Sequence, residues 1–150
     1  MNGRCDEAIT LLLPLKKLTP PASVAGIILG ACYVQKKDFP AAIAELRWAD
    51  AHKSTAALPM LGFALAKSGQ EVEARKILSD LIAGRSSSNG AYGVAVVYAG
   101  LGNFDQAFAW LDKSVREKSV RVYIMDPMFH DLQSDPRFDL FRKRLGGQKP

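Results

Sequence analysis

Small and apolar residues recur along this chain with a stride of about 33 residues. Alanine stands at four corresponding positions, with spacings of 34, 32 and 33 residues: Ala8, Ala42, Ala74 and Ala107. A leucine follows each alanine four positions later, so both side chains lie on one face of a helix. A small residue precedes each of the last three alanines by twelve positions: Gly30, Gly62 and Ala95. The pattern predicts pairs of helices that pack closely where both carry a small side chain.

Polar and glycine-bearing stretches between the apolar runs predict where each helix ends. The expected helices form three hairpins, over about 22–35 and 40–52, 56–68 and 71–83, and 90–101 and 104–118. An unpaired helix is expected before them, from Asp6 as its N-cap to about Lys17. A period near 34 is typical of helix–turn–helix repeats that stack into a solenoid. We therefore expect a single all-α domain over residues 1–150.

The tail departs from this period and carries the pattern Asp-Pro-x-Phe twice, nine residues apart. Asp126 and Asp135 each suit a helix N-cap, because the proline that follows fits the first helical position. Phe138, Phe141 and Leu145 share one face of the second predicted helix, which we expect to cover the open end of the last hairpin. The N-terminal helix has no such cover. We expect an apolar edge there, buried either by self-association or by a longer upstream chain.

The three hairpins resemble tetratricopeptide repeats. The matching residues are Leu29-Gly30, Tyr33, Ala42, Leu46 and Ala49, then Leu61-Gly62, Leu65, Ala74 and Leu78, then Val94-Ala95, Tyr98, Ala107 and Leu111. The resemblance implies a right-handed α-solenoid with a C-terminal capping helix. Its parts would be a half repeat (6–21), repeats at 22–54, 55–87 and 88–119, and a cap (120–147). Residues 102–111 and 134–138 are also similar to the end of such regions in multidomain bacterial regulators.

The function that this resemblance implies is noncatalytic protein–protein interaction, with a peptide or protein partner held in a concave groove. By helical phase, the side chains expected to line the groove are Gln35, Phe63, Lys67, Asn89, Tyr92 and Val96. Phe63 and Tyr92 are the expected anchors, because aromatic side chains often dominate binding energy. We do not expect the family's carboxylate clamp, because Ala31 stands where its first asparagine would be.

Titratable and nucleophilic residues form no arrangement typical of an active site or a metal site. His52 and His130 lie in separate elements, where we expect surface or cap positions. Cys5 and Cys32 lack a Cys-x-x-Cys motif, so two reduced thiols are expected. The glycines over 90–102 lack the lysine and the spacing of a phosphate-binding loop. The sequence therefore predicts no enzyme, no cofactor and no bound metal.

Charge adds one alternative. The net charge is +5, and residues 137–149 hold five basic residues against one acid, with Arg142, Lys143 and Arg144 at their centre. One hypothesis is a basic adaptor that contacts nucleic acid. We favour a solvated cap helix, because basic side chains suit the C-terminal end of a helix and no base-reading motif is present.

A further alternative is the regulatory tail of a larger bacterial signalling or transcription regulator.

Apolar residues make up 48% of the chain, which is enough for a continuous core. No apolar run is long enough to cross a membrane. The apolar run near the N-terminus is interrupted by Pro14 and does not resemble a secretory signal. We expect a cytoplasmic protein with no membrane partner.

Overall fold

The computed structural model describes residues 2–17, 23–84, 90–117 and 127–146, and in these ranges every regular element is a helix. The elements are α1 (Asn2–Leu12), the 3₁₀ helix η1 (Leu13–Lys17), α2 (Ser23–Gln35), α3 (Phe39–Ala51), α4 (Ala57–Lys67), α5 (Glu71–Ile82), α6 (Gly90–Gly100), α7 (Phe104–Arg116), the 3₁₀ helices η2 (Pro127–Phe129) and η3 (Asp131–Ser134), and α8 (Pro136–Gly146). None of the described helices combines the length and the apolar character needed to cross a membrane.

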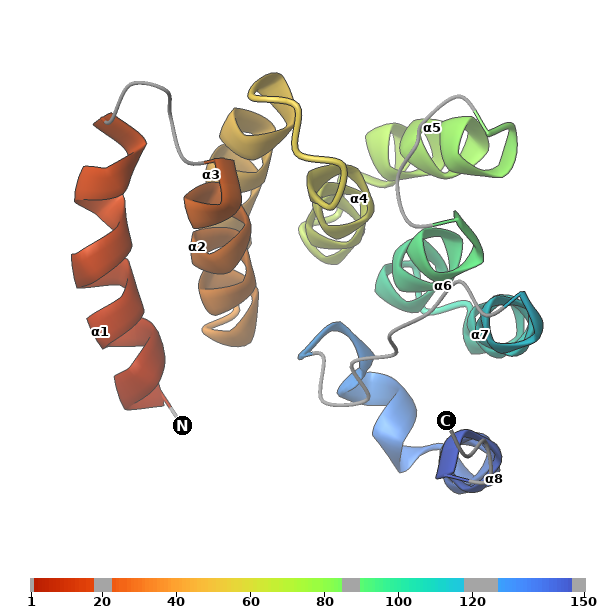
Figure 1. The fold of residues 1–150 in the computed structure, drawn as a ribbon. Helices are drawn as coiled ribbons and strands as arrows, with labels where there is room; N and C mark the ends of the chain where they lie inside the picture. The colour runs from red at the N-terminus through yellow and green to blue at the C-terminus, as the bar shows by residue number, and fades with distance from the viewer. Residues whose placement is uncertain (1, 18–22, 85–89, 118–126, 147–150) are drawn as a thin grey trace.

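The helices α2 to α7 pair as three hairpins: α2 with α3, α4 with α5, and α6 with α7. Each of the six predicted helices is confirmed, and no end differs from its predicted position by more than two residues. Contacts between α3 and α4 and between α4 and α6 join one hairpin to the next. The hairpins follow an arc, and the C-terminal elements return to its inner side (Figure 1).

The turns inside the three hairpins repeat one geometry. The amide that ends each turn donates to the carbonyl five residues earlier, at 2.9, 2.9 and 3.0 Å: Asp38 to Tyr33, Gln70 to Leu65 and Asn103 to Tyr98. The residue before it has positive φ each time, at 59° for Lys37, 84° for Gly69 and 73° for Gly102. The Asp38 and Asn103 side chains cap the next helix by accepting from an amide at 3.2 Å. The sequence period is thus matched by a repeated backbone structure.

The predicted small positions of the three hairpins lie in the core, whereas Ala8 of α1 is only half-buried. Ala42, Ala74, Ala95 and Ala107 are each 0% exposed. A Cβ at Gly30 would stand 2.6 Å from Leu46 of the same hairpin, whereas one at Gly62 would stand 2.8 Å from Val97 in the next hairpin. Such distances are closer than side-chain carbon atoms approach. The small residues therefore permit close packing between hairpins as well as within them.

The helix caps predicted at the two ends of the chain differ in outcome. Asp135 precedes Pro136 at the start of α8, and its carboxylate accepts from the Arg137 amide at 2.9 Å, which confirms the predicted cap. Asp126 and the side chain of Leu145 lie outside the described residues. The prediction that Asp6 caps the first helix is wrong, because α1 already begins at Asn2. The Asp6 carboxylate instead accepts from Lys36, in the turn after α2.

Candidate binding face

The inner face of the arc, which we define by α2, α4 and α6, is the candidate functional site. These are the first helices of the three hairpins, and α4 contacts both α2 and α6. The face is covered in part by the chain itself, because η2 packs against α2 and α6 (Figure 1). We call residues Pro127–Ser134, which hold η2 and η3, the inner segment.

The predicted groove residues do not lie together on one open surface. Phe63 and Val96 are 4% and 1% exposed, so both contribute to the core instead of an open groove. Gln35 is exposed at the end of α2, where its Oε1 accepts from the Cys5 Sγ at 3.0 Å. Asn89 lies outside the described residues. The remaining two, Lys67 and Tyr92, both meet the inner segment.

The inner segment is held mainly by apolar side chains. Met128, Phe129 and Leu132 are 3%, 1% and 0% exposed and belong to the same hydrophobic cluster as α4 and α6. The ring of Phe129 meets the ring of Tyr92 edge-on, with centroids 5.6 Å apart and planes at 76°. Such edge-to-face pairs are favourable beyond the area that they bury. Sequence reasoning did not find this contact, although Phe129 is the aromatic residue of the first Asp-Pro-x-Phe pattern.

An ion pair accompanies this apolar contact. Lys67 at the end of α4 donates a hydrogen bond to the carboxylate of Asp131 in η3. The hydrogen bond from Lys67 lowers the pKa of Asp131 from its ordinary value. The Lys67 ammonium also lies 5.8 Å from the centroid of the Phe63 ring. The face therefore joins a buried apolar surface to the Lys67 ammonium at its rim.

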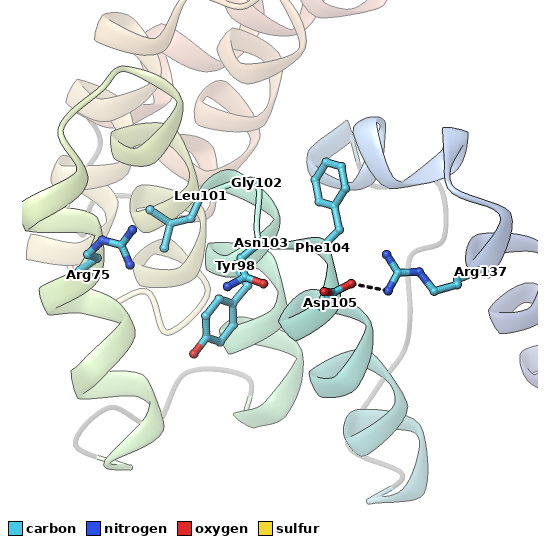
Figure 2. A pocket seen from close by; sticks show the side chains of 8 residues that line it. All are labelled: Arg75, Tyr98, Leu101, Gly102, Asn103, Phe104, Asp105 and Arg137. Carbon is cyan, nitrogen blue, oxygen red and sulfur yellow. Dashed lines mark hydrogen bonds and ion pairs between the residues drawn. The ribbon is translucent and has the colours of Figure 1, made fainter.

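A second candidate is an open hollow of about 500 Å³ between α5, the turn from α6 to α7, and Arg137 of α8 (Figure 2). Its charged groups already have partners. Arg137 pairs with Asp105 at 2.6 Å and with Asp135 at 2.7 Å, and Arg75 pairs with Glu71 at 3.2 Å. Since these guanidinium groups are engaged by carboxylates, the hollow offers little attraction to an anionic ligand.

The histidines lie at helix caps, as expected. His52 follows α3, where its Nδ1 is 2.7 Å from the Trp48 carbonyl oxygen, and His130 is an exposed residue before η3. Among the described residues, no three His, Cys, Asp or Glu side chains are grouped as a metal site would require.

The structure brings the two cysteines together. Both are free and buried, one in α1 and one in α2. Burial, together with the hydrogen bond between the Cys32 thiol and the Cys5 sulfur, raises the pKa of the Cys32 thiol to about 12. Such a thiol stays protonated near neutral pH and is a poor nucleophile.

The predicted basic patch is largely neutralised by neighbouring carboxylates. Arg144 pairs with Asp112 of α7 at 3.0 Å, and Arg142 pairs with Asp139 at 3.7 Å. Lys143 is exposed in the last turn of α8. Two of the three basic groups therefore act within the molecule, and one of them ties α8 to α7.

No family model, curated protein or solved structure matches this chain. What the chain does must therefore be inferred from the contacts of its own residues.

Proposed function

We propose that this chain is a noncatalytic protein-interaction module. Its hairpins would form a right-handed solenoid of the tetratricopeptide kind, and the inner face of α2, α4 and α6 would bind a peptide or protein partner. The observation that carries this proposal is that the face holds a short peptide segment, the chain's own Pro127–Ser134, which does not follow the repeat. A surface that buries Met128, Phe129 and Leu132 of one segment has the shape and the apolar character to bury those of another.

The repeated turns support the scaffold part of the proposal. Three hairpins with the same turn hydrogen bonds and buried alanines at one period provide a rigid support for an inner surface. Helical-repeat proteins vary their binding residues on such a support while the packing positions stay small and apolar. Nucleic-acid binding is less well supported, because Arg142 and Arg144 are paired with acidic side chains.

The test is a selection of binding peptides followed by mapping of where they bind. The full chain is immobilised and screened with a displayed library of random 12-residue peptides. Each enriched peptide is then synthesised with a photo-crosslinking group, and crosslinked residues are identified by mass spectrometry. We expect crosslinks on α2, α4 and α6. Mapping is preferred to loss-of-binding variants, because a variant of this face would also alter its contact with the inner segment.

Two results would overturn the proposal. One is that no peptide is enriched above the background of an unrelated helical protein. The other is that crosslinks are confined to α3, α5 and α7, the second helices of the hairpins. Arg142→Glu is a suitable control, because it changes an exposed charge on α8, which is not one of the helices of the inner face, and should leave peptide binding unchanged.

A further inference from the structure

The inner segment is joined to the inner face by contacts that link distant parts of the chain. Its first turn, η2, contacts α2 and α6, and α2 lies about 100 residues earlier in the sequence. Its second turn, η3, reaches the end of α4 through the pair between Asp131 and Lys67. One short segment therefore contacts the first helices of all three hairpins.

The segment has little regular structure of its own. The turns η2 and η3 are 3₁₀ helices of three and four residues, a length at which helical hydrogen bonds alone give little stability. Its conformation must therefore depend on the face against which it packs. Peptides whose apolar side chains lie in a hydrophobic groove are a recurring mode of recognition between proteins.

The side chains of the segment define a simple pattern. Two adjacent apolar residues, Met128 and Phe129, are buried, and Leu132, three positions after Phe129, is buried on the same side. Between them, Asp131 keeps a half-exposed carboxylate at the rim, where it meets the Lys67 ammonium. The segment that the face holds thus consists of an apolar pair ending in an aromatic residue, an acid two positions later, and a leucine next to that acid.

We propose that the inner face is a receptor for partner peptides with this pattern, and that the inner segment is an intramolecular competitor that such a partner displaces. This inference rests on the proposed function and adds to it the chemistry of the partner and a regulated, self-occupied state. The partner's acid would take the place of Asp131 beside Lys67, and its aromatic residue would replace Phe129 against Tyr92.

A tethered segment competes at an effective concentration in the millimolar range, so it lowers the apparent affinity of any free peptide. The apparent dissociation constant is the intrinsic constant divided by the fraction of chains whose face is open. A change that loosens the segment without altering the face should therefore tighten the binding of a free peptide.

The experiment uses a fluorescein-labelled peptide with the sequence of residues 126–135 and the full-length chain. Binding to the wild-type chain is compared with binding to an opened chain that carries Phe129→Ala and Leu132→Ala. We expect the opened chain to bind the peptide about 100-fold more tightly, because its own segment no longer competes. Circular dichroism verifies that the opened chain keeps its helices.

Charge reversal then tests the pattern itself. In the opened chain, Lys67→Glu should weaken binding of the peptide about fivefold, and a peptide carrying Asp131→Lys should restore it. The matched control is Arg142→Glu in the opened chain, which makes the same change of charge on α8 and should have no effect on either peptide. Restoration by the swapped peptide would place position 131 of the peptide beside position 67 of the chain.

Several outcomes would overturn the inference. The first is a helical opened chain that binds the peptide no better than the wild-type chain does. The second is an opened chain that dimerises by exchange of its C-terminal segments, which would make a second copy the occupant. If the double variant loses its helices, the single variant Asp131→Asn is used in its place. Equal peptide affinity of this variant and the wild-type chain would refute competition. Library peptides that crosslink to α2, α4 and α6 in spite of such a result would leave the proposed function intact.

Discussion

The two ends of the helical arc are covered in opposite ways. At the C-terminal end, α8 buries Phe138 and Phe141, which are 5% and 3% exposed. At the N-terminal end, Leu11 and Leu13 are 70% and 41% exposed, and among the described side chains of α1 Cys5 alone is buried. The expected exposure of apolar side chains at the N-terminal edge is thus confirmed. That a second copy or an upstream chain covers this edge stays a prediction.

Polar contacts take the place of apolar burial where the N-terminal elements meet the first hairpin. The Cys5 thiol donates to Gln35 at 3.0 Å, and Lys16 of η1 pairs with Glu45 of α3 at 2.7 Å while lying 4.7 Å from the centre of the Trp48 ring. The Lys16 and Glu45 side chains are only 20% and 13% exposed, so the cost of removing both charges from water offsets much of their attraction, whereas burial of a phenylalanine ring contributes about 1.5–3 kcal/mol. The comparison indicates that the C-terminal cap stabilises the arc by apolar burial and that the N-terminal helix contributes less of it.

The largest expected effect comes from breaking the C-terminal cap. Phe138→Ala removes a buried ring next to Phe141 and should lower the free energy of unfolding by about 3 kcal/mol. Leu140→Ala is the matched control on the same helix, because Leu140 is 56% exposed, and it should change stability by less than about 0.5 kcal/mol. Urea unfolding followed by circular dichroism measures both. Equal losses for the two variants would contradict the cap assignment.

The second effect concerns alkaline pH and the N-terminal end. The pKa of Cys32 rises from an ordinary value of 9.0 to about 12 in the folded chain. Above pH 9 the unfolded thiol ionises and the folded one does not, so folding stability present below pH 9 is lost as the pH rises toward 12. By pH 10 the loss attributable to this thiol should be about 1 kcal/mol.

Cys32→Ala removes the titrating group and is the measurement that isolates it. The variant should be less stable than the wild-type chain at pH 7, and the difference should narrow between pH 9 and pH 10.5. Thermal unfolding of both proteins across this range shows whether it does. A constant difference at every pH would mean that the Cys32 thiol ionises as easily in the folded chain as in the unfolded one.

The third effect concerns the turns inside the first and the last hairpin. Gly102 in the last hairpin and Lys37 in the first share the left-handed conformation, with φ of 73° and 59°. Glycine adopts it freely, whereas a residue with a Cβ is strained there. Gly102→Ala should therefore lower stability by about 1 kcal/mol, and Lys37→Gly should raise it by about 0.5 kcal/mol. If Lys37→Gly destabilises the chain in urea unfolding, the strain at that turn is not relieved by glycine.

The repeat body was predictable because its information is local and periodic. Ala42, Ala74 and Ala107 recur with one stride, and each small residue is needed where two helices nearly touch. The polar and glycine residues of the turns then fix the ends of the helices to within two residues. The start of α1 was missed because Asp6 resembles an N-cap, while the contact that decides its role is with Lys36, thirty residues away.

The candidate site was predictable only in part, because it depends on a contact that follows no period. Helical phase placed Lys67 and Tyr92 on the inner face, and both lie against the inner segment. The same phase placed Phe63 there, but Gly100 packs directly on the Phe63 backbone. A Cβ at position 100 would lie only 2.8 Å from the Phe63 Cα, so no open groove exists at that position. A 33-residue repeat gives no information on a contact between residues about 100 positions apart. The position of Phe129 against the inner face therefore had no sequence signal beyond its Asp-Pro-x-Phe pattern.

The smallest effect on stability should accompany a clear effect on association. Leu11→Glu replaces an exposed side chain, so the free energy of unfolding should change by less than about 0.5 kcal/mol. If the exposed leucines of the N-terminal edge bind a second copy, the mass of the wild-type chain in light scattering should rise with concentration and that of Leu11→Glu should not. Leu140→Glu is the matched control, because Leu140 is also exposed but lies at the covered end, and it should associate as the wild-type chain does. A wild-type chain that stays monomeric at every concentration, with full helicity, would show that exposed leucines at this end do not drive self-association. A loss of association in Leu140→Glu as large as in Leu11→Glu would show that the two ends do not differ in this respect.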